Sequence, residues 1–215
     1  MASRDDIVAA AFRLFDSAGY DATSADDIAA AAGVSRSTFF RSFGSKEAVV
    51  FPDHDELLER VGHRLGSSPA TSALSAVTDA VKIVLLHYVA EGEHARTRYR
   101  LTSTVPVLRD RELAGTARYQ RLFRSHLSQW GDGTEASELH AEVTSAAVVA
   151  AHNHVLRRWL RGECADPHDE VARALAVVHR TFDAPAAAPA AVVVVPAGTS
   201  MEAVAQSVRA ALGSG

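Results

Sequence analysis

Basic and hydroxyl side chains gather in one short segment near the N-terminus, in a pattern suited to contact with nucleic acid. The segment contains Ser35, Arg36, Ser37, Thr38, Arg41, Ser42, Ser45 and Lys46. Arginine can form two hydrogen bonds with guanine in the major groove, and hydroxyl and ammonium groups bind phosphates. Six of the seven acidic residues among the first 50 precede residue 28. The basic groups of this segment are therefore locally unopposed, although the whole chain has a net charge of −4.

Two helices are predicted ahead of this segment. The first shows apolar residues at helical spacing, namely Ile7, Val8, Ala11, Phe12 and Phe15. It is expected to run for about fifteen residues and to end at Gly19. Ser24 and Asp27 have the spacing of a capping box, which predicts a short helix over 25–32 that ends at Gly33.

A third helix, over 37–42, is predicted to follow directly, with Ser35 as its N-terminal cap. Two short helices joined by a glycine-containing turn form a helix-turn-helix. In such a unit the N-terminal residues of the second helix reach base edges, which assigns base contacts to Arg36, Ser37 and Thr38. The sequence therefore predicts a unit that binds duplex DNA.

Residues 4–50 resemble the N-terminal signature of the TetR family of transcriptional regulators. The resemblance is carried by Thr23-Ser24-Ala25-Asp26-Asp27-Ile28-Ala29 and by Ala32-Gly33-Val34-Ser35-Arg36-Ser37-Thr38-Phe39-Phe40-Arg41-Ser42-Phe43-Gly44-Ser45-Lys46-Glu47. It implies a repressor that is released from a palindromic operator by a small-molecule effector. The residues expected to bind double-stranded DNA are Thr23, Ser24, Ser35, Arg36, Ser37, Thr38, Phe40, Arg41, Ser42, Ser45 and Lys46.

Two residues depart from the family pattern. Phe40 stands where the family often has Tyr, and Ser42 stands where His or Tyr is common. Phenylalanine cannot donate a hydrogen bond to phosphate, so Arg41 and Ser42 would have to carry that contact. The departure bears on the affinity for DNA and leaves the fold unaffected.

The rest of the chain keeps helical periodicity, so the fold class is all-α. The resemblance implies three parts: a helix-turn-helix domain over 1–50, an effector-binding and dimerisation domain over 51–183, and a C-terminal extension over 184–215. Helices over 136–161 and 169–182 are the candidates for a homodimer interface. The first has small residues that permit close approach, and the second has an apolar stripe of Val171, Leu175, Val178 and Phe182.

Polar tips on apolar helices are candidates for an effector pocket. They are His87, Tyr88, Tyr99, Tyr119, His126, His152 and Trp159, with His126 as the first choice. Such groups suit a pocket with a few polar contacts in an apolar lining, although each alone could be a satisfied core residue. Arg96–Arg124 contains eight arginines against Asp110 and Glu112. A solvated surface and an anionic effector both fit that segment.

Two further local predictions concern the ends of the bundle. Pro52 should kink or break the helix that starts at Lys46, because proline removes a helical hydrogen bond. In the extension, an extended run over 192–195 is expected to precede an amphipathic helix that begins at Thr199 and has an apolar stripe from Met201 to Leu212.

Other classes of function lack their residues. Cys164 is the single cysteine, which excludes an internal disulfide and a zinc site built from cysteines. His152 and His154 are two apart and point to different sides of a helix, and Gly131–Ala136 fits a turn between helices. We therefore expect no metal, no cofactor and no catalytic site. With no 18-residue apolar stretch, we also expect a cytoplasmic protein that does not span a membrane.

One rival function remains open at this point. A helical module could bind small molecules or proteins and use its helix-turn-helix only as a scaffold. A steep salt dependence of DNA binding would separate the two hypotheses, because each phosphate contact releases counterions.

Overall fold

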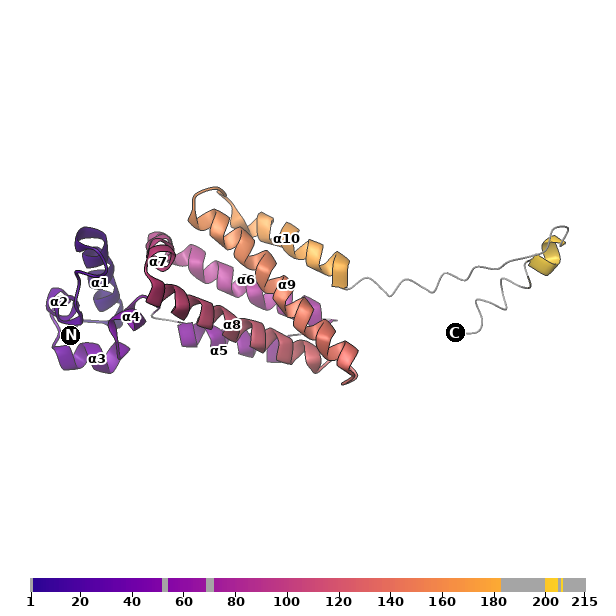
Figure 1. The fold of residues 1–215 in the computed structure, drawn as a ribbon, viewed down its shortest axis with the longest axis horizontal. Helices are drawn as coiled ribbons and strands as arrows, with labels where there is room; N and C mark the ends of the chain where they lie inside the picture. Colours follow the sequence, from indigo (N-terminus) through magenta and orange to yellow (C-terminus); the bar gives the residue numbers. More distant parts are fainter. Residues whose placement is uncertain (1, 52–53, 69–71, 183–199, 205, 207–215) are drawn as a thin grey trace. The chain divides into compact units, whose positions relative to one another are not determined.

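The computed structural model describes residues 2–51, 54–68, 72–182, 200–204 and 206. Within these ranges every regular element is a helix, which confirms the all-α prediction. The chain divides into Met1–Phe182 and Asp183–Gly215, and each part is described by itself. The first part contains the helices α1 to α10 shown in Figure 1.

Three N-terminal helices form the predicted helix-turn-helix unit: α1 (Arg4–Ala18), α2 (Ala25–Ala31) and α3 (Arg36–Phe43). Capping boxes open α1 and α2, at Ser3 and Ser24 respectively. Both satisfy N–H groups that a helix start otherwise leaves unbonded. A compact apolar core includes Ile7, Phe12, Phe15, Ile28, Phe39 and Phe43. Packing from all three helices therefore fixes the orientation of α3.

The turn between α2 and α3 depends on one glycine. Gly33 has φ of +67°, a left-handed conformation that a side chain disfavours. The Val34 amide then donates to the Ala29 carbonyl at 2.9 Å, and the Ser35 hydroxyl accepts from the Thr38 amide at 3.1 Å. The sequence Gly-Val-Ser thus ends one helix and starts the next, as predicted.

The helix that starts at Lys46 is interrupted, as Pro52 predicted. The short α4 covers Lys46–Val49, and α5 covers His54–Gly66. Residues 52 and 53 lie outside the described ranges. Val49 and Val50 are fully buried in the core of the helix-turn-helix unit, together with Leu108 from the bundle.

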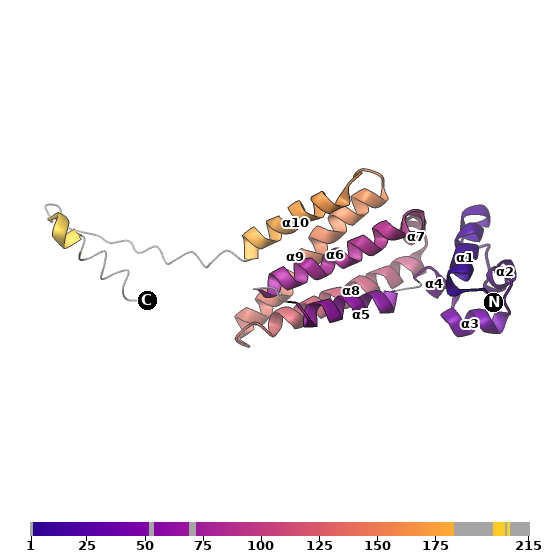
Figure 2. The ribbon, with the colours of Figure 1, turned by 180° about the vertical axis from the view of Figure 1, so that it is seen from behind.

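A bundle follows, made of α5, α6 (Ala73–Glu91), α7 (Glu93–Thr104), α8 (Pro106–Ser128), α9 (Glu135–Leu160) and α10 (Pro167–Phe182). Pro106 stands at the first position of α8, where no N–H is needed. Thr134 caps α9, so the Gly131–Ala136 segment is a turn between helices as expected. The long α9 packs against α8 on one side and α10 on the other, as Figures 1 and 2 both show.

The most apolar helix of the bundle is α6. Among the described residues it is the one helix long and apolar enough to cross a membrane by composition, which corrects the expectation that no such stretch exists. Half of its apolar window is buried inside the bundle. It also contains Asp79 and Lys82, paired at 3.0 Å on its more exposed side. These features fit a core helix of the bundle.

The C-terminal part is described only at 200–204 and 206. Met201–Val204 is helical, and the Ala203 amide donates to the Ser200 hydroxyl at 3.4 Å. Met201 is exposed. The predicted extended run over 192–195 and the remainder of the predicted helix lie outside the described residues.

Candidate operator-binding and effector-binding sites

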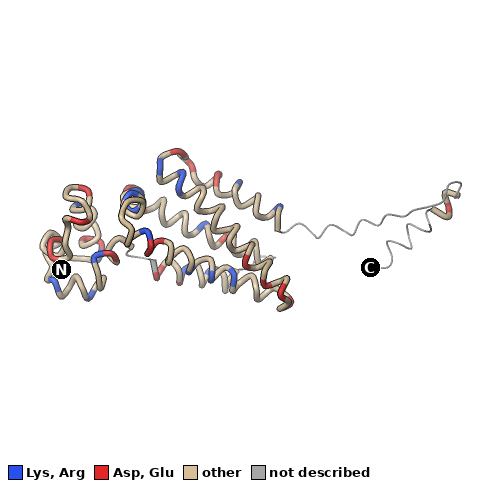
Figure 3. The backbone as a smooth tube through the Cα atoms, viewed as in Figure 1, with Lys and Arg blue, Asp and Glu red and all other residues tan. Residues whose placement is uncertain are grey.

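The start of α3 presents a cluster of hydroxyls beside one arginine. The Ser35 hydroxyl lies 2.9 Å from those of both Ser37 and Thr38. Ser35, Arg36 and Ser37 are exposed, whereas Thr38 is half-buried. Figure 3 shows α3 with basic positions and without acidic ones. This helix end can therefore meet a DNA groove with donors and positive charge.

Arg36 is held in place by two neighbours. One terminal nitrogen forms a hydrogen-bonded ion pair with the Asp26 carboxylate on α2. Its guanidinium carbon lies 5.1 Å from the centre of the Phe40 ring, one turn further along α3. The Asp26 contact uses one edge of the guanidinium and leaves other N–H groups for a base. Phe40, which departs from the family pattern, thus supports Arg36 from below.

Two predicted phosphate ligands have structural contacts in the free protein. Thr23 is buried, and its hydroxyl donates to the Gly19 carbonyl at 2.8 Å. The Lys46 ammonium donates at 2.9 Å to the carbonyls of both Tyr20 and Thr23. Lys46 therefore joins α4 to the loop before α2 and has one N–H left for an outside acceptor. Sequence spacing alone could not show that these carbonyls lie within its reach.

The other predicted DNA ligands lie on or near α3. Arg41 is exposed, while Ser42 and Ser45 are half-buried. Ser24 and Ser45 are N-terminal caps, so their hydroxyls already accept amide hydrogens from Asp27 and Ala48. These groups remain at helix starts, where the helix dipole favours an anion.

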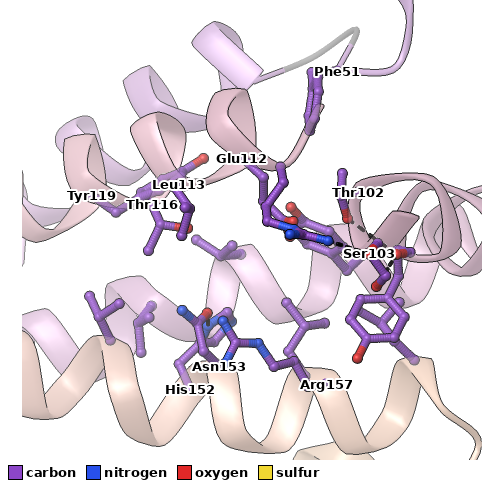
Figure 4. Close-up of a pocket in the computed structure, with 18 of the residues that line it drawn as sticks. Phe51, Thr102, Ser103, Glu112, Leu113, Thr116, Tyr119, His152, Asn153 and Arg157 are labelled. Carbon is purple, nitrogen blue, oxygen red and sulfur yellow. Dashed lines mark hydrogen bonds between the residues drawn. The ribbon is translucent and has the colours of Figure 1, made fainter. Parts of the chain in front are cut away.

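A cavity of about 420 Å³ lies in the bundle, walled by α6, α7, α8 and α9 together with Phe51. Figure 4 shows side chains of α8 and α9 facing each other across it. Its apolar lining includes Val81, Val84, Leu113, Phe123, Val149 and Leu156. Its polar lining includes Thr116, Tyr119, His152 and Asn153, and its charged lining is Arg109, Glu112, Arg157 and Arg161. An apolar chamber with a few polar groups suits a small organic ligand.

Four of the seven predicted effector residues line this cavity: Tyr88, Tyr99, Tyr119 and His152. Burial raises the pKa of Tyr88 and Tyr119 above their ordinary range and lowers the pKa of His152 to about 4. All three side chains are thus neutral at pH 7. They can bind a ligand only through hydrogen bonds and ring contacts.

The remaining three predictions are corrected, because those residues do not line this cavity. His126 lies two turns beyond Tyr119 on α8, past the end of the chamber, although burial does lower its pKa. His87 faces Glu91 at 3.8 Å. Trp159 packs in the core beneath the Arg96 guanidinium, at 4.9 Å. Helical spacing placed all three on partly apolar faces but could not say which face borders the cavity.

The sequence prediction missed the charged and amide groups at the cavity, above all Asn153 and Arg157. Both lie on the same face of α9 as His152, within about a turn and a half. A search for polar residues at that spacing from His152 would have found them.

The arginine-rich segment 96–124 is largely paired. Arg100, Arg118 and Arg124 form ion pairs with Asp16, Asp55 and Glu142, respectively. Arg98 is buried, with both terminal nitrogens bonded to the Glu91 carboxylate. Arg109 lines the cavity. The segment is therefore mainly an ion-paired surface that supplies one residue to the cavity.

Buried apolar contacts also correct one detail of the predicted dimer helices. Val171, Leu175 and Val178 of α10 are buried in the core of their own protomer. The large apolar side chains left exposed on α9 and α10 are Leu139, Val143 and Val177. The stripe read from the sequence holds α10 to α9 and is unavailable to a second subunit.

No group of three metal-ligating side chains occurs in the part of the chain that the structure describes. Cys164 is buried, and burial raises the pKa of its thiol. The site chemistry that is present consists of exposed donors on a helix-turn-helix and a partly polar cavity in a helical bundle. That combination defines a DNA-binding protein that responds to small molecules.

The chain belongs to the TetR family of bacterial regulatory proteins. The profile described as "Bacterial regulatory proteins, tetR family" matches residues 7–61, and the one described as "MftR C-terminal domain" matches residues 71–183. The chain is thus a ligand-responsive, DNA-binding transcriptional regulator of the kind that acts as a homodimer on an operator.

Similar proteins agree with this assignment. The protein named as mycofactocin biosynthesis transcriptional regulator MftR in Mycobacterium tuberculosis is 24% identical over 177 residues, which are 80% of this chain and 87% of that protein. A SmeT–triclosan complex has a TM-score of 0.60 and 18% identity, over 84% of this chain and 91% of SmeT. FadR of Thermus thermophilus, solved with lauroyl-CoA, has a TM-score of 0.54 and 22% identity, over 88% of this chain and 100% of FadR. The two structures show the shared fold.

Proposed function

We propose that this regulator is a cytoplasmic repressor, without a catalytic step, that reads its operator through the start of α3. The observation that carries this proposal is the exposed set of Arg36, Ser37 and their neighbours beside a recognition helix free of acidic residues. Arg36 is the residue that can discriminate guanine, by roughly 1 to 3 kcal/mol. Arg41 and the helix starts at Ser24 and Ser45 contact phosphates and set the register.

The cavity between α8 and α9 is the proposed effector site. Its lining includes Phe51, directly after the buried Val50 of the helix-turn-helix core. A ligand in the cavity thus touches the chain at the junction of the two domains. Binding that favours one arrangement of this junction changes the population of the operator-binding state.

The proposed dimer surface is the outer face of α9 and α10. Leu139, Val143 and Val177 are exposed there, and Leu139 reaches 61% exposure. Ala146 and Ala150 leave a shallow groove on the same helix, where a second helix can approach closely. A two-fold dimer through this face matches a palindromic operator with half-sites about one DNA turn apart.

Selection from random duplex DNA with the purified protein, at one moderate salt concentration, tests the proposal. Enrichment of a two-fold symmetric motif is the expected result. That motif then supplies the operator for measuring release by candidate effectors. A folded dimer that enriches no sequence would refute operator recognition and favour the rival interaction module.

A further inference from the structure

The proposed effector cavity contains a buried polar atom that the protein itself leaves unbonded. His152 is 4% exposed, and its Nε2 has no hydrogen-bond partner among the described residues. Buried polar atoms are nearly always bonded, because an unmet hydrogen bond destabilises the folded state. Since His152 lines the cavity, a bound molecule is in a position to supply the missing partner.

The other ring nitrogen fixes what that partner must be. Nδ1 of His152 lies 3.1 Å from Oδ1 of Asn153. A carboxamide oxygen only accepts hydrogen bonds, so the ring proton is on Nδ1 and Nε2 offers a lone pair. Burial keeps the pKa of His152 at about 4, so the ring stays neutral at pH 7. The missing partner is therefore a hydrogen-bond donor.

The second feature is a cation on the same wall of the cavity. Arg157 follows His152 by five residues on α9, roughly 7.5 Å along the helix axis. Its guanidinium has no hydrogen bond or ion pair with any residue that the structure describes, whereas Arg161 is bonded to Glu163 and Arg109 to the Ser103 carbonyl. Figure 4 shows Arg157 and Asn153 extending from α9 toward α8.

The charges that line the cavity also favour an anion. Its three arginines face a single carboxylate, that of Glu112 on the opposite wall. Arg157 and Arg109 are exposed and Leu113 beside them is exposed too, while His152, Tyr119 and Phe123 are buried. The charged end of the cavity is therefore its open end, and the histidine lies in the closed part. An acid can keep partial contact with water there while its apolar body enters.

We propose that the effector is an organic acid that also carries a hydroxyl group, with the acid on Arg157 and the hydroxyl donating to Nε2 of His152. The apolar walls take the carbon chain between the two groups. This inference rests on the proposed effector site and goes beyond it by naming the chemical class of the ligand. A hydroxyl at the closed end distinguishes this class from acids with a plain hydrocarbon tail.

A matched pair of probes makes the test one of sign. 8-Hydroxyoctanoate and nonanoate differ only in a terminal hydroxyl in place of a methyl group. If the closed end of the cavity is simply apolar, nonanoate binds more tightly, because burying an unpaired hydroxyl is unfavourable. If His152 accepts a hydrogen bond, 8-hydroxyoctanoate binds more tightly, by about tenfold, or roughly 1.4 kcal/mol. Calorimetric titration of the full chain without DNA measures both.

Variants assign the preference to the two residues. His152→Leu is expected to reverse it, and Arg157→Gln to weaken both acids by a similar factor of about ten while leaving their ratio unchanged. Exposed His63 on α5 and exposed Arg121 on α8 supply the controls, as His63→Gln and Arg121→Gln. Neither control residue lines the cavity.

The proposal is overturned if the unmodified chain prefers nonanoate, if it binds neither acid, or if the preference survives in His152→Leu. Should that variant fail to fold, the comparison of the two probes on the unmodified chain and on the surface variant Arg157→Gln still decides. Operator selection is a separate experiment on the same protein. Loss of operator binding with the hydroxy-acid preference intact refutes the proposed function alone, and the converse result refutes only this inference.

Discussion

Arg98 of α7 donates from Nε to the carbonyl of Val50 at 2.7 Å, and so joins the bundle to the last residue before the domain junction. Its terminal nitrogens bind both oxygens of Glu91 on α6. The Tyr88 ring, which lines the cavity, lies 5.4 Å from the Arg98 guanidinium carbon. One side chain at 6% exposure thus touches the cavity wall, a neighbouring helix and the helix-turn-helix core.

Replacing Arg98 should uncouple the cavity from the operator. Arg98→Met leaves Glu91 largely buried without its cation, so we expect unfolding free energy to fall by about 3 kcal/mol. Arg98→Lys keeps a charge but cannot bridge both Glu91 and Val50, so effector-induced release should weaken while folding is retained. Urea unfolding and operator titration with and without effector measure these effects. Unchanged release in Arg98→Lys would show that coupling takes another route.

Asp26 should govern how selectively Arg36 reads DNA. In Asp26→Asn the guanidinium loses its charged partner and the phosphates lose a nearby negative charge. We therefore expect non-specific DNA to bind more tightly and discrimination at one base position to fall by about 1 kcal/mol. Sequencing of selected pools gives the discrimination at each position. Asp21→Asn, an exposed acid on the loop before α2, is the control and should leave the motif intact.

Sequence patterns predicted the fold and part of the site, for identifiable physical reasons. Capping boxes and helical periodicity are local, so Ser24, Gly33 and Ser35 marked helix ends correctly. The cavity depends on which helices meet. His126 and His152 both looked like buried polar residues, yet only the packing of α8 on α9 puts His152 at the chamber.

The same limit applies to residues that pair over long separations. Nothing local to Arg98 indicates that its partners are Glu91 and the Val50 carbonyl. It stood in the sequence as one of several arginines in a basic segment. Likewise, Lys46 had the spacing of a phosphate ligand, while the structure shows its contacts with loop carbonyls.

Arg41 should contribute to affinity mainly through phosphate charge. It is exposed on α3, and no ion pair holds it among the described residues. In Arg41→Gln we expect weaker binding to every sequence and a decrease of about 0.9 in the slope of log K against log salt concentration per contact, taken over the two subunits. Fluorescence anisotropy at several salt concentrations measures the slope. A slope that matches the unmodified protein would place Arg41 away from the phosphates.

His152 should make stability sensitive to acid. Its pKa is lowered to about 4 by burial, against an ordinary value of about 6.5 in the unfolded chain. The unfolded state then binds a proton first, so this group's contribution is fully present above about pH 6.5 and is lost as pH falls toward 4. The loss is at most about 3 kcal/mol. His152→Gln should flatten the pH profile in this window, as measured by urea unfolding, and an unchanged profile would contradict burial of a neutral ring.

Dimerisation should fail when charge is placed on the outer face of α9 and α10. Val143→Glu and Val177→Asp introduce carboxylates at half-exposed apolar positions that cost little in an isolated protomer. Across a two-fold interface each change occurs twice, so an unpaired buried charge should weaken the dimer by several kcal/mol. Sedimentation should then show folded monomers, and operator affinity should fall because two half-sites are no longer bound together. Leu86→Asp, at an exposed apolar position of α6, is the matched control. Dimers that persist in Val143→Glu and Val177→Asp but dissociate in Leu86→Asp would move the interface to α6.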